Sequence, residues 1–209
     1  MDPNTFPTKG NLILAKNSLA LAMQGYELMD KKRNILIREL MELIDEASSL
    51  QQEIHDTFAK AYASLQIANI NNGISTVMEI AATTPLEDSI RIKTRSIMGT
   101  EIPLVEYTPS NTIQYSLQDT KASLDLATQN FEKVKALTIR LSQVENSAYR
   151  LATNIKKTQK RANALKNITI PSLTNLVKDI TVALEEKERE EFTRLKVIKR
   201  NNLKKKEKK

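Results

Sequence analysis

The sequence contains no cysteine and no tryptophan, and only 4% of its 209 residues are aromatic. Without cysteine the chain can form neither disulfides nor thiolate metal sites, which agrees with a reducing cytoplasm. Glycine and proline are also scarce, with four and six residues. This composition suits a thin helical rod better than a thick globular core, which normally contains large aromatic side chains.

Long apolar runs are absent as well. No segment approaches the roughly 18–20 apolar residues that a membrane span requires, and the N-terminus lacks the apolar core of a signal peptide. We therefore expect a soluble, cytoplasmic protein with no direct membrane insertion.

Motifs that carry chemistry are missing too. None of the four glycines begins the GxxxxGK[ST] spacing of a phosphate-binding loop, and a single histidine, His55, excludes paired-histidine metal sites. The densest acidic cluster is best explained as a solvated helix face with the i,i+4 ion pairs Glu185–Arg189 and Glu190–Arg194. We predict no catalytic residue, no cofactor-binding residue and no metal site.

The positive charge is concentrated at one end. The formal net charge is +7, and residues 199–209 contribute seven basic residues and one acidic residue, a local charge of +6. The rest of the chain therefore sums to +1. A nucleic-acid reader of the basic-zipper kind needs basic residues along a helix that is continuous with its seam. In this sequence the basic residues follow the end of the seam, so we predict no nucleic-acid partner. Residues 201–209 are predicted to form a basic disordered tail.

A heptad pattern in the C-terminal half predicts a long helix that packs along another helix. The pattern slips by one residue around Ile170 and Pro171, where a kink or local unwinding is expected because proline removes a helical hydrogen bond. Near the C-terminus the seam positions become polar. The seam comprises Val144, Ala148, Leu151, Ile155, Thr158, Ala162, Leu165, Leu173, Val177, Ile180, Leu184, Lys187, Glu191, Arg194 and Ile198.

The N-terminal half contains the matching seam. It follows Thr8, a plausible N-cap, and repeats with few polar exceptions from Leu12 to Ala68. One helix of about 60 residues would be roughly 90 Å long. Asn72 and Gly73 are stop signals that end it. Two such helices in one chain predict an antiparallel pair.

The segment between the helices differs in character. Residues 74–80 fit either a short helix or an extended stretch. Residues 89–95 then alternate apolar and polar side chains, and further β-rich runs flank Gly99. This pattern predicts a small β-hairpin at about 89–107, with Pro103 restricting its strand to a sheet edge.

The predicted fold class is therefore all-α: a long antiparallel two-helix coiled coil with a small β-hairpin insert at the end opposite the termini. The predicted domain boundaries are an N-terminal coiled-coil helix over residues 1–70, the insert over 71–116, a C-terminal coiled-coil helix over 117–200, and the tail over 201–209.

The sequence offers few candidate contact residues. A basic patch beside the seam includes Lys157, Lys160 and Arg161. Ordinary solvation explains this patch as well as docking onto an acidic partner does. The charged C-terminal segment adds further candidates. The predicted partner-contact residues are Lys157, Lys160, Arg161, Glu188, Arg189 and Arg194.

Several segments resemble a known family, the D subunits of the V/A-type rotary ATPases. They are residues 7–33, which include Gly25 and Tyr26; residues 157–165, with the word Lys-Arg-x-Asn-Ala-Leu; residues 168–171, which end in Ile-Pro; and residues 184–196. The similarity covers both ends of the chain and the layout between them.

The resemblance implies a function that the bare residues do not indicate. It implies the central shaft of a rotary ATPase, which couples ATP hydrolysis or synthesis to rotation and to proton or sodium transport. The implied partners are the small F subunit, the catalytic ring of A and B subunits, and the adaptor of the membrane ring. The alternative interpretation is a free-standing coiled-coil scaffold or tether.

Overall fold

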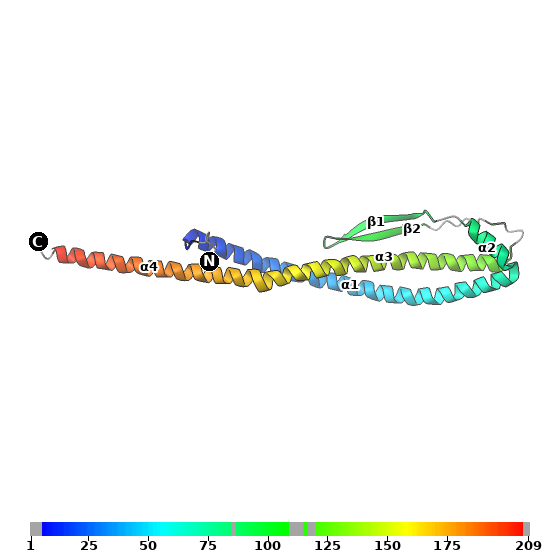
Figure 1. Ribbon diagram of the computed structural model, residues 1–209, viewed down its shortest axis with the longest axis horizontal. Coiled ribbons are helices and arrows are strands. Elements are labelled where there is room, and N and C mark those ends of the chain that lie inside the picture. Colours follow the sequence, from blue (N-terminus) through cyan, green and yellow to red (C-terminus); the bar gives the residue numbers. More distant parts are fainter. Residues whose placement is uncertain (1–5, 85–86, 109–114, 117–119, 207–209) are drawn as a thin grey trace. The chain divides into compact units, whose positions relative to one another are not determined.

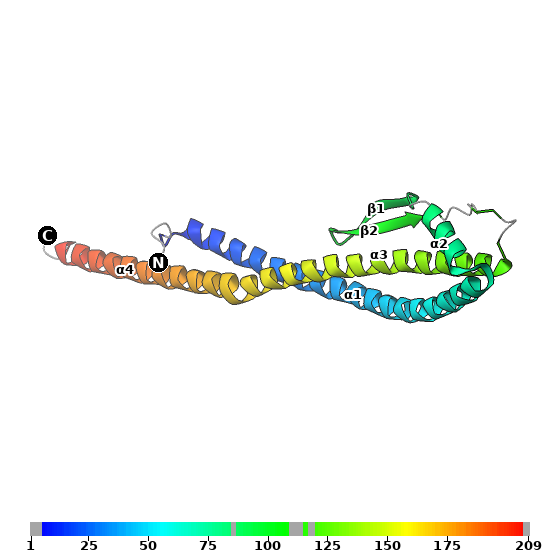
Figure 2. The same cartoon turned by 45° about the vertical axis from the view of Figure 1, so that its right-hand side comes forward.

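The computed structural model describes residues 6–84, 87–108, 115–116 and 120–206. Its elements, labelled in Figure 1 and seen from a second side in Figure 2, are in chain order α1 (Lys9–Asn72), α2 (Ile74–Thr83), β1 (Ile90–Ile97), β2 (Thr100–Tyr107), α3 (Ala122–Ala164), the π-helical segment η1 (Leu165–Thr169) and α4 (Ile170–Lys206). The predicted fold class is confirmed, since long helices pack against each other and a small antiparallel hairpin lies between them in the sequence.

The chain divides into two compact units. The insert unit comprises residues 34–156, and the terminal unit comprises residues 1–33 together with 157–209. Both α1 and α3 contribute residues to each unit.

In the insert unit, α1 and α3 are antiparallel. Glu46 pairs with Arg140 across a 2.8 Å ion pair, whereas the later residue Asn72 accepts a 3.0 Å hydrogen bond from the backbone N–H of the earlier residue Lys121. Positions therefore rise along α1 as they fall along α3. The buried residues between these helices are Leu36, Leu50, Ala61, Ser64, Ala68, Leu124, Ala127, Val134, Val144, Ser147 and Leu151.

Ser64, a polar exception in the N-terminal seam, is satisfied inside this helix pair. Its side chain is 7% exposed. The hydroxyl donates to the carbonyl of Lys60 at 2.8 Å and accepts from Nδ2 of Asn130 at 2.8 Å. Because a buried hydroxyl is costly only when it lacks partners, the seam tolerates a serine here.

The chain reverses immediately after α1. Asn72 donates from Nδ2 to the carbonyl of Ala68 at 3.2 Å, and Gly73 adopts a φ of 82° that suits glycine. The segment that fits either helix or strand in the sequence is α2. Its Val77 packs in a cluster with Ala68, Leu124 and Ala127.

The two strands form a tight hairpin. Ile97 and Thr100 are the last paired residues, and Met98 and Gly99 between them have φ values of 49° and 74°. Two positive φ angles are what a type I′ turn requires, and this turn matches the right-handed twist of the strands. The predicted hairpin around Gly99 is confirmed.

In the terminal unit, α1 again runs antiparallel to the C-terminal helices. Lys9, the first residue of α1, forms a 3.1 Å ion pair with Glu188 of α4. At the other end of the unit, Arg33 donates to the side-chain oxygen of Gln159 at 2.9 Å. As in the insert unit, later residues of α1 lie opposite earlier residues of the C-terminal half.

A π-helical segment, η1, explains the phase slip in the C-terminal seam. A π turn contains one more residue than an α turn, so it shifts the apolar positions by one residue. It ends immediately before α4, in which Pro171 is the second residue. Proline cannot donate to the carbonyl of Asn167, which lies within η1. The expected unwinding therefore precedes the proline.

The helix ends confirm one expectation and correct another. Oγ1 of Thr8 accepts from the backbone N–H of Asn11 at 3.2 Å, so Thr8 caps α1 as predicted. The predicted disordered tail is wrong as far as Lys206, because α4 continues to that residue. Residues 207–209 lie outside the described part of the chain. The same holds for Leu117, where we expected the second helix to begin; α3 begins at Ala122.

Candidate interaction surfaces

The β-hairpin lies along α3 within the insert unit, and β2 is the strand nearer to that helix in both views (Figures 1 and 2). Oε1 of Gln143 accepts a 2.9 Å hydrogen bond from the backbone N–H of Val105. Arg150 donates to the backbone carbonyl of Glu101 at 3.3 Å. Side chains of α3 therefore satisfy main-chain groups at the outer edge of β2.

Ile102 anchors the hairpin in the core of the insert unit. Its side chain is 8% exposed and clusters with Leu36 of α1 and Leu151 of α3, which are both fully buried. Burying an isoleucine side chain stabilises a structure by about 2 kcal/mol. At the hairpin tip, Asn154 donates a hydrogen bond to the hydroxyl of Thr100.

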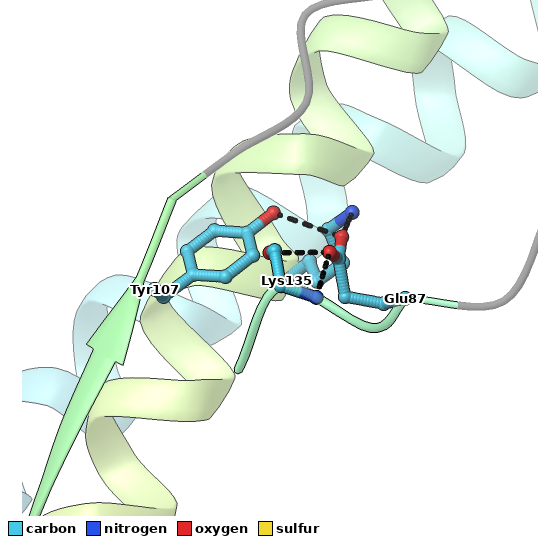
Figure 3. A network of polar contacts seen from close by, with 4 residues as sticks. Glu87, Tyr107 and Lys135 are labelled. Carbon is cyan, nitrogen blue, oxygen red and sulfur yellow. Dashed lines mark hydrogen bonds and ion pairs between the residues drawn. The ribbon is translucent and has the colours of Figure 1, made fainter. Parts of the chain in front are cut away.

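A polar network fastens the other end of the hairpin to α3 (Figure 3). Nζ of Lys135 lies 2.6 Å from Oε2 of Glu87, whose side chain is 19% exposed. The hydroxyl of Tyr107 donates to the same oxygen at 3.4 Å, and the backbone N–H of Ser89 donates to the other oxygen at 3.2 Å. The carboxylate thus joins the start of β1 and the end of β2 to α3.

This network holds Glu87 in its charged form. The hydrogen bond from Lys135, followed by that from the Ser89 hydroxyl, lowers the pKa of Glu87 from 4.5 to about 2. The hydrogen bond to Glu87 also raises the pKa of Lys135. A carboxyl group with so low a pKa is a poor proton carrier near neutral pH. The arrangement therefore suits fastening rather than acid–base catalysis.

The basic patch predicted from the sequence is exposed. Lys157, Lys160 and Arg161 lie at the end of α3, and all three are open to solvent. Among the described residues, none of the three belongs to an ion pair. Their charge is thus available to a partner.

The second group of predicted contact residues lies on α4. Glu188 pairs with Lys9, and Arg189 and Arg194 form the predicted i,i+4 pairs with their glutamates at 3.9 and 3.6 Å. The run of helix from residue 161 to residue 188 spans 27 residues, roughly 40 Å at 1.5 Å per residue. The structure therefore does not bring the two predicted groups together.

α1 and α4 are antiparallel, and the C-terminal part of α4 extends past the point where α1 begins. Since Lys9 pairs with Glu188, the helix from residue 189 onward has no segment of α1 opposite it in the described chain. Its apolar side chains are correspondingly open, with Phe192 67% and Leu195 66% exposed. The polar seam positions Glu191 and Arg194 are exposed too.

Apolar side chains also remain exposed in the insert unit, and sequence periodicity did not single them out. Ile37, Met41 and Ile44 follow each other at helical steps of four and three on α1 and are 40–54% exposed. A second group, at the reversal of the chain, is 52–83% exposed. It comprises Ile67, Ile70, Ile74 and Met78.

Over the described ranges, no group of three or more histidine, cysteine, aspartate or glutamate side chains could hold a metal ion. Over the same ranges, none of the helices combines the length and the apolar character of a membrane span. The exposed side chains described above define four candidate interaction surfaces: the hairpin, the apolar stripes, the basic patch and the free end of α4.

Comparison with known proteins identifies the family. A profile of the family described as the D subunit of ATP synthase matches residues 11–200. The chain belongs to the ATP synthase D-subunit family. It is 46% identical over 194 residues to the V-type ATP synthase D subunit of Thermotoga neapolitana, covering 92% of this chain and 96% of that relative. It is 39% identical over 197 residues to the A-type ATP synthase D subunit of Pyrococcus horikoshii, covering 92% of each.

The D-subunit match extends over both units. It includes the paired helices, the hairpin and all the contact residues predicted from the sequence, since these lie between residues 11 and 200. A further relative, the A-type ATP synthase D subunit of Methanosphaera stadtmanae, is 34% identical over 199 residues, covering 93% of each chain. The resemblance found in the sequence is therefore confirmed.

Proposed function

We propose that the chain is the central rotor shaft of a V/A-type ATPase, a non-catalytic component that couples events in a ring of A and B subunits to rotation. The observation that carries this proposal is the antiparallel pairing of long helices in both units of a D-subunit chain. Paired helices resist bending and twisting better than one helix does. A shaft changes nucleotide affinity in a surrounding ring only through different contacts with successive ring states.

Reconstitution tests this proposal directly. A ring of A and B subunits should hydrolyse ATP with rotation of a probe fixed to this chain, and the rotation should disappear when the chain is omitted. The isolated chain should bind no ATP in calorimetry, since it has no phosphate-binding loop. Stoichiometric nucleotide binding would contradict a non-catalytic role, and hydrolysis without any rotation of the chain would favour the scaffold or tether.

The small F subunit is the proposed partner of the insert unit. The support is the exposed stripe of Ile37, Met41 and Ile44, because an apolar stripe of this spacing suits a partner that packs along a helix. Met41→Lys should weaken binding of the F subunit by about tenfold or more. Met23→Lys is the matched control, since Met23 is similarly exposed at 49% but lies in the terminal unit. Equal effects of the two variants would contradict this assignment.

The predicted charged residues are proposed to contact the catalytic ring. Lys157, Lys160 and Arg161 offer an exposed basic patch, and Arg189 and Arg194 add exposed charges. Each such contact is worth little by itself, ~0–1 kcal/mol, so several together can guide a shaft without trapping it. Reversing all three charges of the basic patch should lower torque in the reconstituted ring while leaving binding of the F subunit unchanged.

The proposed setting follows from the family. An adaptor of the membrane ring would bind the shaft and transmit rotation to proton or sodium transport, with the chain on the cytoplasmic side and peripheral to the membrane. Co-purification from the host should recover the F subunit, the A and B subunits and the adaptor in one complex. Recovery of the chain alone at physiological salt would contradict the proposal.

A further inference from the structure

The outer edges of β1 and β2 differ in whether their outward backbone groups contact another element. In an antiparallel ladder, residues alternate between those that exchange hydrogen bonds with the other strand and those whose N–H and C=O groups point outward. Val105 donates its N–H to Gln143, so it belongs to the outward set. By alternation Glu101 and Pro103 belong to the same set, and the carbonyl of Glu101 accepts from Arg150.

Pro103 fits this assignment, because a proline at an outward position removes no hydrogen bond from the ladder. The outer edge of β2 therefore contacts α3 at Glu101 and Val105, and it has no N–H donor at Pro103. Residues that lie opposite each other in the register belong to the same set, so the outward residues of β2 identify those of β1. These are Ile90, Ile92, Thr94 and Ser96.

The outer edge of β1 is open. In Figures 1 and 2, β2 lies between β1 and α3. Within the described chain, no element other than β2 pairs with β1, and residues 90–96 are exposed throughout. Such an edge is a template for another strand unless its side chains prevent pairing.

The side chains of β1 select the kind of strand that can pair. Arg91, Lys93 and Arg95 share one face of the strand, and only Lys93 has an acidic partner among the described residues, Glu106 at 2.6 Å. The opposite face presents Ile92, which is 71% exposed. A second copy of β1 would set basic residues against basic residues, which opposes self-pairing.

We propose that the outer edge of β1 binds an extended segment of a partner protein by strand addition, and that this segment carries acidic residues at alternate positions with apolar residues between them. Main-chain hydrogen bonds to the outward groups at Ile92 and Thr94 provide binding, and opposite charges across from Arg91 and Arg95 provide selectivity. The proposal concerns the insert unit alone and holds whether or not the chain rotates.

The test uses the full chain and a fluorescent peptide of sequence Thr-Glu-Val-Glu-Val-Glu-Thr, with binding followed by anisotropy. Thr94→Pro removes one outward donor of β1 without touching the ladder, just as Pro103 does at the position opposite it. This variant should bind the peptide about tenfold more weakly. Protection of the Val105 amide against hydrogen exchange should be unchanged, which shows that the hairpin remains docked.

Charge reversal tests the selectivity. Arg91→Glu combined with Arg95→Glu should lose binding of the acidic peptide and gain binding of its lysine counterpart, Thr-Lys-Val-Lys-Val-Lys-Thr. Lys60→Glu combined with Lys133→Glu is the control, because both residues are exposed on helices of the same unit. Methylation of alternate peptide amides should abolish binding for one set of positions and spare it for the other.

Three results would overturn the proposal. The first is the absence of peptide binding at millimolar concentration. The second is binding that survives Thr94→Pro and both methylation sets, which would place the peptide elsewhere. The third is an equal response to the two charge-reversal variants, which would reduce the effect to net charge.

Discussion

Ile102 of β2 packs with Leu36 of α1, although 66 positions separate them in the chain. Through this contact the β-hairpin packs against the helix pair as a third layer of the insert unit. The contact also explains why a short two-stranded sheet, which is marginal on its own in water, keeps a defined position.

The first prediction concerns this anchor. Ile102→Ala should destabilise the docked hairpin by about 2–4 kcal/mol, because it removes buried atoms and leaves a cavity beside Leu36 and Leu151. Hydrogen exchange of the Val105 amide should then accelerate by about 30-fold or more, while helical circular dichroism stays unchanged. Ile92→Ala, on the exposed face of the same hairpin, should leave exchange unaffected.

Deletion of residues 89–107 tests what the same contact contributes to the stability of the helix pair. The long helices should remain folded, but the surface around Leu36 and Leu151 loses its cover, so the free energy of unfolding should fall. We expect altered ATPase rate or coupling in the reconstituted ring. Complete unfolding of the helix pair after this deletion would show that the insert is required for folding.

The second prediction concerns pH. Because the pKa of Glu87 lies at about 2 in the folded chain instead of 4.5, its carboxylate stabilises the docked hairpin fully above about pH 4.5. That contribution should be lost as the pH falls from 4.5 towards 2. The chain has no cysteine, so labels on cysteines placed at Met98 and Glu145 can report the hairpin–helix distance uniquely.

Two variants isolate Glu87 in this experiment. Glu87→Gln should open the hairpin at neutral pH and remove much of its dependence on acid. Glu46→Gln, which removes another carboxylate of the insert unit from an ion pair, should retain the acid transition. An unchanged transition in Glu87→Gln would exclude Glu87 as the group responsible.

The third prediction concerns the polar pair inside the helix seam. Ser64→Ala should cost about 1 kcal/mol, since Nδ2 of Asn130 then loses its partner in a half-buried position. The double variant with Asn130→Ala should be less destabilised than the sum of the single variants. A coupling energy of about 0.5–1.5 kcal/mol in urea unfolding is expected. Strict additivity would show that the hydrogen bond contributes nothing.

The parts of the fold that sequence analysis predicted are those that repeat or that need a special residue. Heptad steps predicted both helices, Thr8 predicted a helix start, and Gly99 predicted the hairpin turn. The one-residue slip around Ile170 and Pro171 predicted a local irregularity, which the structure shows just before these residues as the π-helical segment η1.

The docked position of the hairpin could not be predicted in this way. Ile102 contacts Leu36 and Leu151, and Glu87 contacts Lys135, through the tertiary fold alone. No local period connects residues so far apart in the chain. The predicted contact residues raise the same difficulty, since exposure of Lys157 or Arg189 shows that a partner could reach them and does not identify that partner.

The last prediction concerns the free end of α4. Truncation after Glu188 removes the helix that has no segment of α1 opposite it, so the melting temperature should change by no more than ~2 °C. Binding of the F subunit should also be unchanged. If this end guides the shaft in the ring, torque or the coupling of ATP hydrolysis to rotation should nevertheless fall. Rotation of a bead on the reconstituted ring measures both quantities.

Truncation after Arg200 is the matched control, because it removes the basic tail and keeps most of the free helix, including Phe192 and Leu195. A loss of coupling after Glu188 but not after Arg200 would assign the effect to residues 189–200, where shallow charged contacts can act on the ring. Unchanged coupling in both variants would leave ordinary fraying of a chain end as the explanation. A fall in melting temperature beyond ~5 °C would instead mean that this end packs against the rest of the terminal unit.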